Sequence, residues 1–188
     1  MTSNSTIAII IVSFNVERLL RECIESIYRE TRHARFEIWV IDNASRDNSV
    51  PMLRQNFPEV HLIENDDNVG FTRANNQAIR RCRSDYVLLL NPDTLIEDGA
   101  IDRMVQFMDA HPDVGVSGCQ VLNEDGSLQL ACRRSIPSPA VAFFRLTGLS
   151  RLFPRSRVMA RYNLTYLDPM QTHEVDAVSG AFLLIRRR

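Results

Sequence analysis

Lysine is missing from this sequence, since all 22 of its basic residues are arginines. We interpret this as a bias of the coding sequence toward G and C; the alternative is a functional demand for guanidinium groups. A strong charge of either sign is missing too, because 23 acidic residues leave a net charge of −1. Such a chain has no overall attraction to nucleic acid or to an anionic membrane. We therefore expect no nucleic-acid partner.

Cysteine pairs and long apolar runs are also absent. No C-x-x-C pair occurs, and the four cysteines stand far apart, at Cys23, Cys82, Cys119 and Cys132. This spacing indicates neither a zinc site nor a small disulfide scaffold, and it favours buried thiols in a reducing compartment. The N-terminal region has only six consecutive apolar residues, 7–12, too few for a signal peptide or a membrane span. We expect a cytoplasmic protein.

Strand and helix patterns alternate along the first two thirds of the chain. The expected strands are 7–12, 36–41, 60–63, 86–90 and 114–121, and apolar residues at helical spacing mark helices over 16–27, 72–82 and 101–108. Asn15 is the expected N-cap of the first helix. The alternation predicts an α/β fold with a mostly parallel sheet flanked by helices. A length of 188 residues fits a single domain, 1–188.

The pattern changes after Val121. A turn over 123–127 is expected to join two short apolar pieces as a hairpin. Residues 132–170 contain four prolines and many arginines without a clean period, and 174–185 has the pattern of one last strand.

Short polar groups follow four of the predicted strands. They are Ser13-Phe14-Asn15, Asp42-Asn43-Ala44-Ser45-Arg46-Asp47, Asn65-Asp66-Asp67-Asn68-Val69-Gly70-Phe71 and Asn91-Pro92-Asp93. Each group alone is equally well explained as a turn or a helix cap. Ligands of parallel α/β sheets bind beyond the carboxyl ends of the strands, so four such groups at one edge indicate a ligand site.

The chemistry of these groups suits a sugar nucleotide. Asp42 could accept hydrogen bonds from a pyrimidine base or a ribose hydroxyl, and Gly70 lets the backbone approach a ligand closely. Arg73, in the first turn of its helix, could reach a pyrophosphate. Asp93 suits a Mg²⁺ or Mn²⁺ ion held mainly by substrate phosphates, because such ions usually take only one or two protein carboxylates. Alternatively, Asp93 is a turn residue or an N-cap before Thr94.

These stretches resemble the inverting glycosyltransferases of family two, most closely their bacterial rhamnosyltransferase-like members. The matching segments cover nearly the whole chain in the family's order: 12–15, 41–45 with Asp47, 68–71 with 74–76, 90–94 and 178–181. The resemblance implies a glycosyltransferase-A type fold, with 1–122 as the nucleotide-sugar-binding half and 123–188 as the start of the acceptor-side half.

The resemblance also implies roles for individual residues. Asn91-Pro92-Asp93 stands where the family has its D-x-D metal motif, with an amide in place of the first carboxylate, so Asp93 is the one expected metal ligand. Asp176 falls where such enzymes approach the donor sugar and acceptor, and a polar residue at a strand edge is the equal alternative. The residues expected to bind the nucleotide sugar are Ser13, Asn15, Asp42, Asn43, Asp47, Asn68, Gly70, Phe71, Arg73, Asn76, Asn91 and Asp93.

The implied reaction is a single displacement at the anomeric carbon. The resemblance implies rhamnose as the sugar, passing from a dTDP- or UDP-linked donor to a glycan or lipid-linked acceptor, with a carboxylate as general base. Family members carry this base after the Gly-Ala strand, and this sequence ends at Arg188 before such a segment. We expect a truncated chain that binds the donor but transfers sugar poorly; the alternative is a shortened enzyme with Asp176 as its base.

Two other classes of protein remain open. One is a non-catalytic nucleotide-sugar-binding module, and the other is a nucleotidyltransferase, although the Gly-rich loop usual after the first strand of that class is missing. Residues 141–157 are both apolar and basic, which fits a peripheral contact with the inner face of the membrane. The alternatives for this segment are a flap packed on the sheet or a surface covered by a missing C-terminal part.

Overall fold

The computed structural model describes residues 5–187, and these form two compact units. The first unit contains the chain up to Ser117 and again from Gly180 onward. The second unit is Gly118–Ser179. The sequence-based division placed 1–122 and 123–188 in separate halves, whereas the structure returns the C-terminal strand to the first unit.

The first unit is built on a six-stranded sheet with the order β3-β2-β1-β4-β8-β5. Neighbouring strands among β1 to β4 run parallel, and β8 is antiparallel to both β4 and β5. The predicted α/β fold with a mostly parallel sheet is confirmed. The strands are β1 (Thr6–Ser13), β2 (Arg35–Asp42), β3 (His61–Glu64), β4 (Tyr86–Leu90), β5 (Val116–Ser117) and β8 (Phe182–Arg186).

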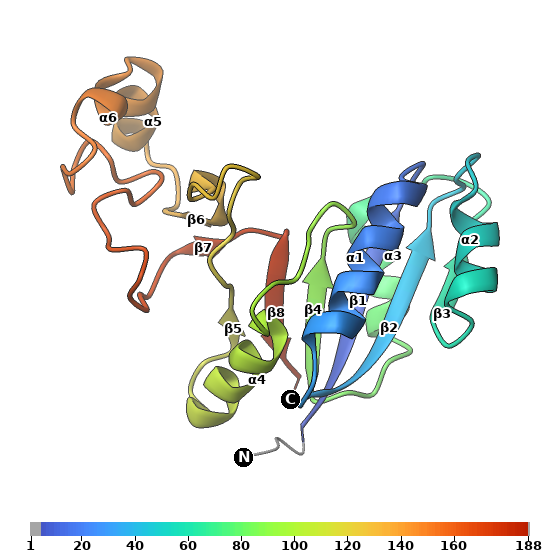
Figure 1. Ribbon diagram of the computed structural model, residues 1–188. Coiled ribbons are helices and arrows are strands. Elements are labelled where there is room, and N and C mark those ends of the chain that lie inside the picture. Colours follow the sequence, from blue (N-terminus) through green and yellow to red (C-terminus); the bar gives the residue numbers. More distant parts are fainter. Residues whose placement is uncertain (1–4, 188) are drawn as a thin grey trace. The chain divides into compact units, whose positions relative to one another are not determined.

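Helices cover both faces of this sheet, with α1 in front and α3 behind in Figure 1. On the α3 side, Ala8 and Ile10 of β1 pack in one buried cluster with Ala74 and Ala78. The alternate residues of β1 point to the other face and are also buried, which explains its continuous apolar run. The helices are α1 (Glu17–Glu30), α2 (Ser49–Asn56), α3 (Phe71–Ile79) and α4 (Ala100–Ala110).

A buried carboxylate in α4 holds the loop between α1 and β2. Asp102 accepts hydrogen bonds from the backbone N–H groups of Arg32 (2.8 Å), His33 (3.2 Å) and Ala34 (2.8 Å). Only 6% of Asp102 is exposed, so these three donors replace the water that the charge has lost. The contact ties α4 to the end of α1, far from the carboxyl ends of the strands.

Two predicted strands differ in the structure. The strand expected over 114–121 is only Val116–Ser117, because Gly115 and Gly118 flank it and the chain leaves the first unit at Gly118. The strand expected over 174–185 is two strands, β7 (Ala177–Val178) and β8, separated at Gly180. β7 pairs with a strand of the second unit, whereas β8 joins the six-stranded sheet.

The second unit contains little regular structure. Its predicted turn is confirmed, since the Asn123 N–H donates to the Ser127 carbonyl at 2.8 Å. Ser138 caps α5 by accepting a hydrogen bond from the Val141 N–H, and Pro139 is the first helical residue. The Ser-Pro pair at 138–139 is thus a local helix-start signal within a segment for which no helix was predicted. The elements are η1 (Leu130–Cys132), β6 (Arg133–Arg134), α5 (Pro139–Leu146), α6 (Leu149–Leu152) and β7.

Within residues 5–187, none of the helices has the length and apolar character needed to cross a membrane.

Candidate active site

The carboxyl ends of β1, β2, β3 and β4 meet at one edge of the sheet. Ser13 at the end of β1 is in register with Asp42 at the end of β2, and Asp42 is in register with Glu64 of β3. Leu90 at the end of β4 is in register with Ile11. The four polar groups that follow these strands therefore begin at the same edge, as the parallel topology predicts.

A hydrogen-bond network joins the ends of β1 and β2. Ser45 donates to both carboxylate oxygens of Asp42, from its hydroxyl at 2.5 Å and its N–H at 2.8 Å. The Asn15 N–H donates to the Ser45 hydroxyl at 2.9 Å, and the Asn15 side-chain oxygen accepts from the Arg46 N–H at 2.7 Å. Asn15 therefore does not cap α1, and that expectation is wrong. Asp42 is buried, and its two bonds leave further lone pairs on the carboxylate.

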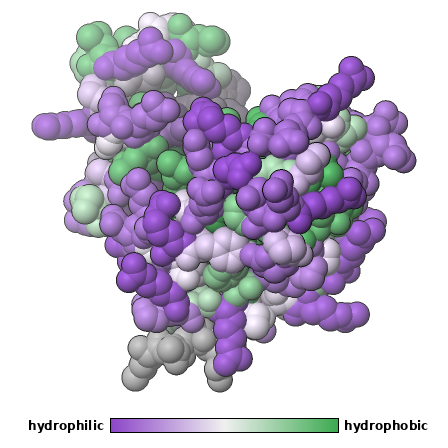
Figure 2. All heavy atoms as spheres, turned by 45° about the vertical axis from the view of Figure 1, so that its right-hand side comes forward, coloured by the Kyte–Doolittle hydropathy of each residue, from purple (hydrophilic) through white to green (hydrophobic). Residues whose placement is uncertain are grey.

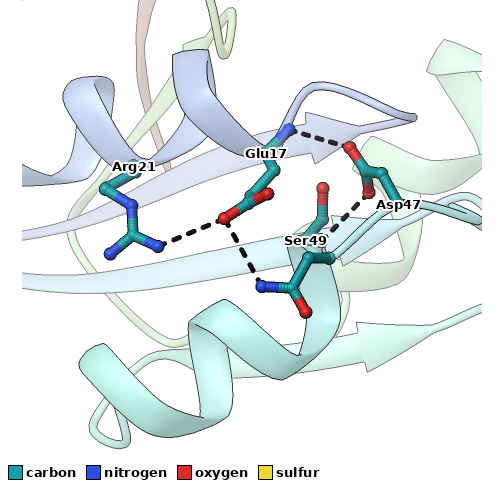
Figure 3. A network of polar contacts seen from close by, with 5 residues as sticks. Glu17, Arg21, Asp47 and Ser49 are labelled. Atoms are coloured by element: carbon teal, nitrogen blue, oxygen red, sulfur yellow. Dashed lines mark hydrogen bonds and ion pairs between the residues drawn. The ribbon is translucent and has the colours of Figure 1, made fainter.

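Asp47 supplies the cap that Asn15 does not. Its Oδ2 accepts from the N–H of Glu17, the first residue of α1, and its Oδ1 accepts from the N–H of Ser49, the first residue of α2, both at 3.0 Å. Figure 3 shows this bridge, together with the ion pair between Glu17 and Arg21. Burial raises the pKa of Asp47, but the hydrogen bonds from Ser49 and Glu17 outweigh it and the pKa is lowered. The carboxylate therefore positions two helix N-termini.

We expect Asp47→Ala to destabilise the protein in a pH-dependent way. At pH 7 the free energy of unfolding should fall by about 1–2 kcal/mol, the usual cost of losing helix caps. Because the folded-state pKa is lowered, the ionised carboxylate stabilises above its unfolded pKa of about 4, and this contribution is lost as the pH falls. Urea unfolding at pH 7 and pH 3 measures the difference in the free energy of unfolding between wild type and variant. An unchanged difference at the two pH values would contradict the assigned role.

Side-chain amides connect the ends of β2 and β3 to α3. Asn65 donates to the Asn43 side-chain oxygen at 3.0 Å, and Asn65 and Gln77 exchange two hydrogen bonds at 3.1 and 2.8 Å. Asn43 was singled out in the sequence, whereas Ser45, Asn65 and Gln77 were not assigned roles there. Ser45 and Asn65 lie within the polar groups and could have been found, but Gln77 lies mid-helix and carries no local signal.

The N-terminus of α3 opens at this edge. Gly70 precedes it with φ 81° and ψ 163°, and the Asn68 side-chain oxygen accepts from the Gly70 N–H at 3.0 Å. Within residues 5–187 no side chain is seen to cap this helix, and Phe71, Arg73 and Asn76 are exposed. For the side chains of Arg73 and Asn76, no hydrogen bond or ion pair occurs within 5–187. Free helical N–H groups and a guanidinium on the first turn form a suitable position for an anion.

Gly70→Ala should lower stability, because the backbone conformation of Gly70 belongs to a region that is essentially restricted to glycine. We expect the free energy of unfolding to fall by about 1–3 kcal/mol, although a Cβ at this position would meet no atom within 4 Å. Gly115→Ala is the matched control, since Gly115 also has open space and lacks a positive φ. Equal effects of the two substitutions in urea unfolding would contradict the strain argument.

Asp93 lies in a turn directly after β4. The Asn91 N–H donates to the carbonyl of Ala181, the residue immediately before β8, at 3.2 Å. The Thr94 N–H donates to the Asn91 carbonyl, also at 3.2 Å. Asp93 itself is exposed, and its carboxylate has no hydrogen bond or ion pair within the described residues.

Burial, with the negative charge of Asp93 as a smaller cause, raises the pKa of the Cys23 thiol to about 12. Cys23 therefore stays protonated and is not a nucleophile.

The donor set around Asp93 limits what kind of metal site can form. No group of three or more His, Cys, Asp or Glu side chains within 5–187 is arranged to hold a metal ion. A single exposed carboxylate fits an ion that takes most of its ligands from phosphate and water. The site thus fits Mg²⁺ or Mn²⁺ bound together with a nucleotide, and it does not fit a structural metal.

Asp176 belongs to the second unit, immediately before β7. Its Oδ2 accepts from the Ile136 N–H at 3.1 Å, and the residue is exposed. This bond ties the segment before α5 to the start of β7. The catalytic role expected for Asp176 stays a prediction.

The mostly parallel sheet, flanked by helices and edged with polar groups at its strand ends, is the architecture of an α/β protein with a candidate ligand site. The chain belongs to glycosyl transferase family 2, whose family model matches residues 8–188. The predicted glycosyltransferase-A type fold is confirmed by the likeness to solved glycosyltransferases.

Three similar proteins illustrate this membership. The N-acetylglucosaminyl-diphospho-decaprenol L-rhamnosyltransferase of Mycobacterium tuberculosis is 27% identical over 161 residues, 80% of this chain and 52% of that enzyme. The Pyrobaculum calidifontis mannosyltransferase, solved with GDP-mannose and Mn²⁺, is 26% identical with a TM-score of 0.58, covering 65% of this chain and 37% of that one. Staphylococcus aureus TarS, solved with UDP-GlcNAc, shares the fold at 19% identity and a TM-score of 0.57, over 72% of this chain and 38% of TarS. The chain spans about half or less of each.

Proposed function

We propose that this chain carries the donor site of an inverting glycosyltransferase, which binds a nucleoside diphosphate sugar at the carboxyl ends of β1 to β4. The observation that carries the proposal is the meeting of four polar strand ends at one edge, in a chain of family 2. Because the chain spans about half or less of its relatives' lengths, sugar transfer is proposed for the whole protein and donor binding for this chain.

The base and ribose would bind at the ends of β1 and β2. The Ser13 hydroxyl is buried there without a hydrogen-bond partner within 5–187, and Asp42 keeps unused lone pairs on its carboxylate. A ligand hydroxyl or ring N–H at this position would satisfy both groups. Asn15, Asn43 and Asp47 would act mainly by holding the shape of the loops around the ligand.

The diphosphate would bind between the N-terminus of α3 and the turn that carries Asp93. Arg73 and the free N–H groups of α3 would neutralise its charge, and Gly70 would keep the backbone close. When bound, Mg²⁺ or Mn²⁺ would stabilise the departing nucleoside diphosphate, with Asp93 as its protein ligand. Phe71, near Gly180, and Asn91, near Ala181, would lie beside the sugar end of the donor.

The finer specificity rests on the similar proteins. The rhamnosyltransferase supports rhamnose as the sugar and a lipid-linked glycan as the acceptor. A role in the biosynthesis of a cell wall or polysaccharide is supported by a relative named for teichoic acid biosynthesis. The two solved structures support GDP and UDP donors beside dTDP. Asp176 is the proposed general base within this chain. The proposed location of the protein is the cytoplasm.

The second candidate function is a non-catalytic module that binds a nucleotide sugar. The hydrogen bond between Asp176 and Ile136 favours it, because that carboxylate oxygen already has a structural task. The nucleotidyltransferase hypothesis has no support from the family match.

Calorimetric titration of the 188-residue chain with dTDP, UDP and GDP, each with and without Mn²⁺, tests the proposal. We expect one nucleoside diphosphate to bind more tightly than the others and more tightly with Mn²⁺. Hydrolysis or transfer of the matching nucleotide sugar would favour the enzyme, and binding without turnover would favour the module. Absence of binding to all three nucleotides would contradict both functions.

A further inference from the structure

The second unit contains a segment in which every charged side chain is basic. Between Gly126 and Leu167 there is no aspartate, glutamate or histidine, and all 23 acidic residues of the chain lie outside this segment. The segment carries seven arginines: Arg133, Arg134, Arg145, Arg151, Arg155, Arg157 and Arg161. A net charge of −1 for the whole chain therefore conceals a strongly basic stretch.

The same segment exposes large apolar side chains on and after the helices α5 and α6. Leu146, at the end of α5, is 86% exposed, and Leu152, at the end of α6, is 70% exposed. Phe143 lies one turn before Leu146 on the same side of α5 and is 56% exposed, whereas Val141 is the residue that α5 buries. Phe153 and Val158, which follow α6 in the chain, are exposed as well, at 47% and 63%.

Arginines with no internal partner lie among these apolar residues. For the side chains of Arg151, Arg155 and Arg157 no hydrogen bond or ion pair is present within 5–187, and all three are exposed. Arg145 differs, because its guanidinium stacks 4.2 Å from the ring centroid of Tyr162. Figure 2 shows hydrophobic and hydrophilic side chains next to each other at the upper left, where α5 and α6 lie.

We propose that this surface docks on an anionic phospholipid bilayer. The α5–α6 surface is defined as Phe143, Leu146, Arg151, Leu152, Phe153, Arg155, Arg157 and Val158. Its apolar side chains would enter the boundary between headgroups and acyl chains, and its guanidinium groups would pair with lipid phosphates. The segment itself has no carboxylate that a negatively charged lipid surface would repel.

This inference goes beyond donor binding and does not depend on it. The surface belongs wholly to the second unit, whereas the residues proposed to bind the donor nucleotide belong to the first. Vesicle binding and nucleotide binding can therefore succeed or fail separately.

Co-sedimentation of the full 188-residue chain with vesicles tests the proposal. We expect binding to phosphatidylcholine vesicles that contain phosphatidylglycerol, much weaker binding to pure phosphatidylcholine, and a decline as salt screens the charges. The triple variant Arg151→Gln, Arg155→Gln, Arg157→Gln should reduce the partition coefficient roughly 100-fold, because each basic residue at an anionic surface contributes about a factor of five. The matched control is Arg80→Gln, Arg81→Gln, Arg83→Gln, three exposed arginines of the first unit, and it should bind as wild type does.

A second variant separates the apolar contribution. Leu146→Ser with Leu152→Ser keeps every charge, and it should reduce binding at both low and high salt. Equal partition into anionic and neutral vesicles, or equal loss in the control triple variant, would overturn the proposal. The proposal would also be overturned if the chain did not bind vesicles and formed a dimer instead. Sedimentation velocity would then show that the two serine substitutions dissociate this dimer.

Discussion

Replacing Asp93 with asparagine is expected to remove the metal dependence of nucleotide binding. In wild type, Mn²⁺ should tighten binding of the preferred nucleoside diphosphate, because the ion would contact both the phosphates and Asp93. The asparagine side chain has the same size as aspartate but no charge, so it would hold the ion poorly. Loss of one charged contact corresponds to a weakening of roughly 10- to 100-fold in the presence of Mn²⁺. Calorimetric titration of wild type and Asp93→Asn, with and without Mn²⁺, measures this change in nucleotide affinity.

Asp98→Asn is the matched control for this substitution. Asp98 is exposed in the same connection between β4 and α4, and its φ of 50° is one that asparagine tolerates. The control removes the same charge five positions further along the chain and should leave Mn²⁺-dependent binding unchanged. If both variants lost affinity equally, the effect would come from net charge, and Asp93 would have no special role.

The largest expected loss of stability follows from Asp102→Ala. Three successive backbone N–H groups, of Arg32, His33 and Ala34, donate to the buried carboxylate. Removing it leaves these donors without their acceptor and opens a space beside α4. We expect the free energy of unfolding to fall by about 3–4 kcal/mol, measured by urea unfolding at pH 7.

Two further variants test this account of Asp102. Asp113→Ala removes an exposed carboxylate with no partner in the described residues, and it should change stability by less than about 0.5 kcal/mol. Asp102→Asn keeps one acceptor oxygen, so its effect should lie between those of the two alanine variants. A loss for Asp102→Ala no larger than that for Asp113→Ala would show that the loop between α1 and β2 does not depend on this contact.

The parallel part of the fold was predictable because its strands are buried on both faces. The run of apolar residues in β1 and the exact bounds of β4, Tyr86–Leu90, follow directly from that burial. The chain's return to the sheet was not predictable in the same way. The stretch 174–185 was expected as one strand, although Ser179 and Gly180 interrupt its apolar residues, and the pairing partners show that β7 and β8 lie on either side of this interruption.

The candidate site was predictable as a location but not as a set of contacts. The polar groups had to meet at one edge once the strands were parallel. The partner of each side chain depends on approach between distant segments, as with Asp47 and Glu17, which are 30 residues apart. Asn15 looked like a cap because it precedes α1, but the structure uses it to bind the Arg46 N–H. Local sequence carries no information about that exchange.

The most direct test of the central claim is an amide chemical-shift titration of the ¹⁵N-labelled chain with the preferred nucleoside diphosphate and Mg²⁺. The proposed donor site predicts that the largest shifts occur at Asn15, Asp42, Gly70, Arg73 and Asp93, at the carboxyl ends of β1 to β4. A hollow of about 400 Å³ at the opposite edge, beside Arg35, Glu37, Arg83 and Ser84, is the competing position. Shifts concentrated around that hollow, or no shifts at saturating nucleotide, would contradict the proposed donor site.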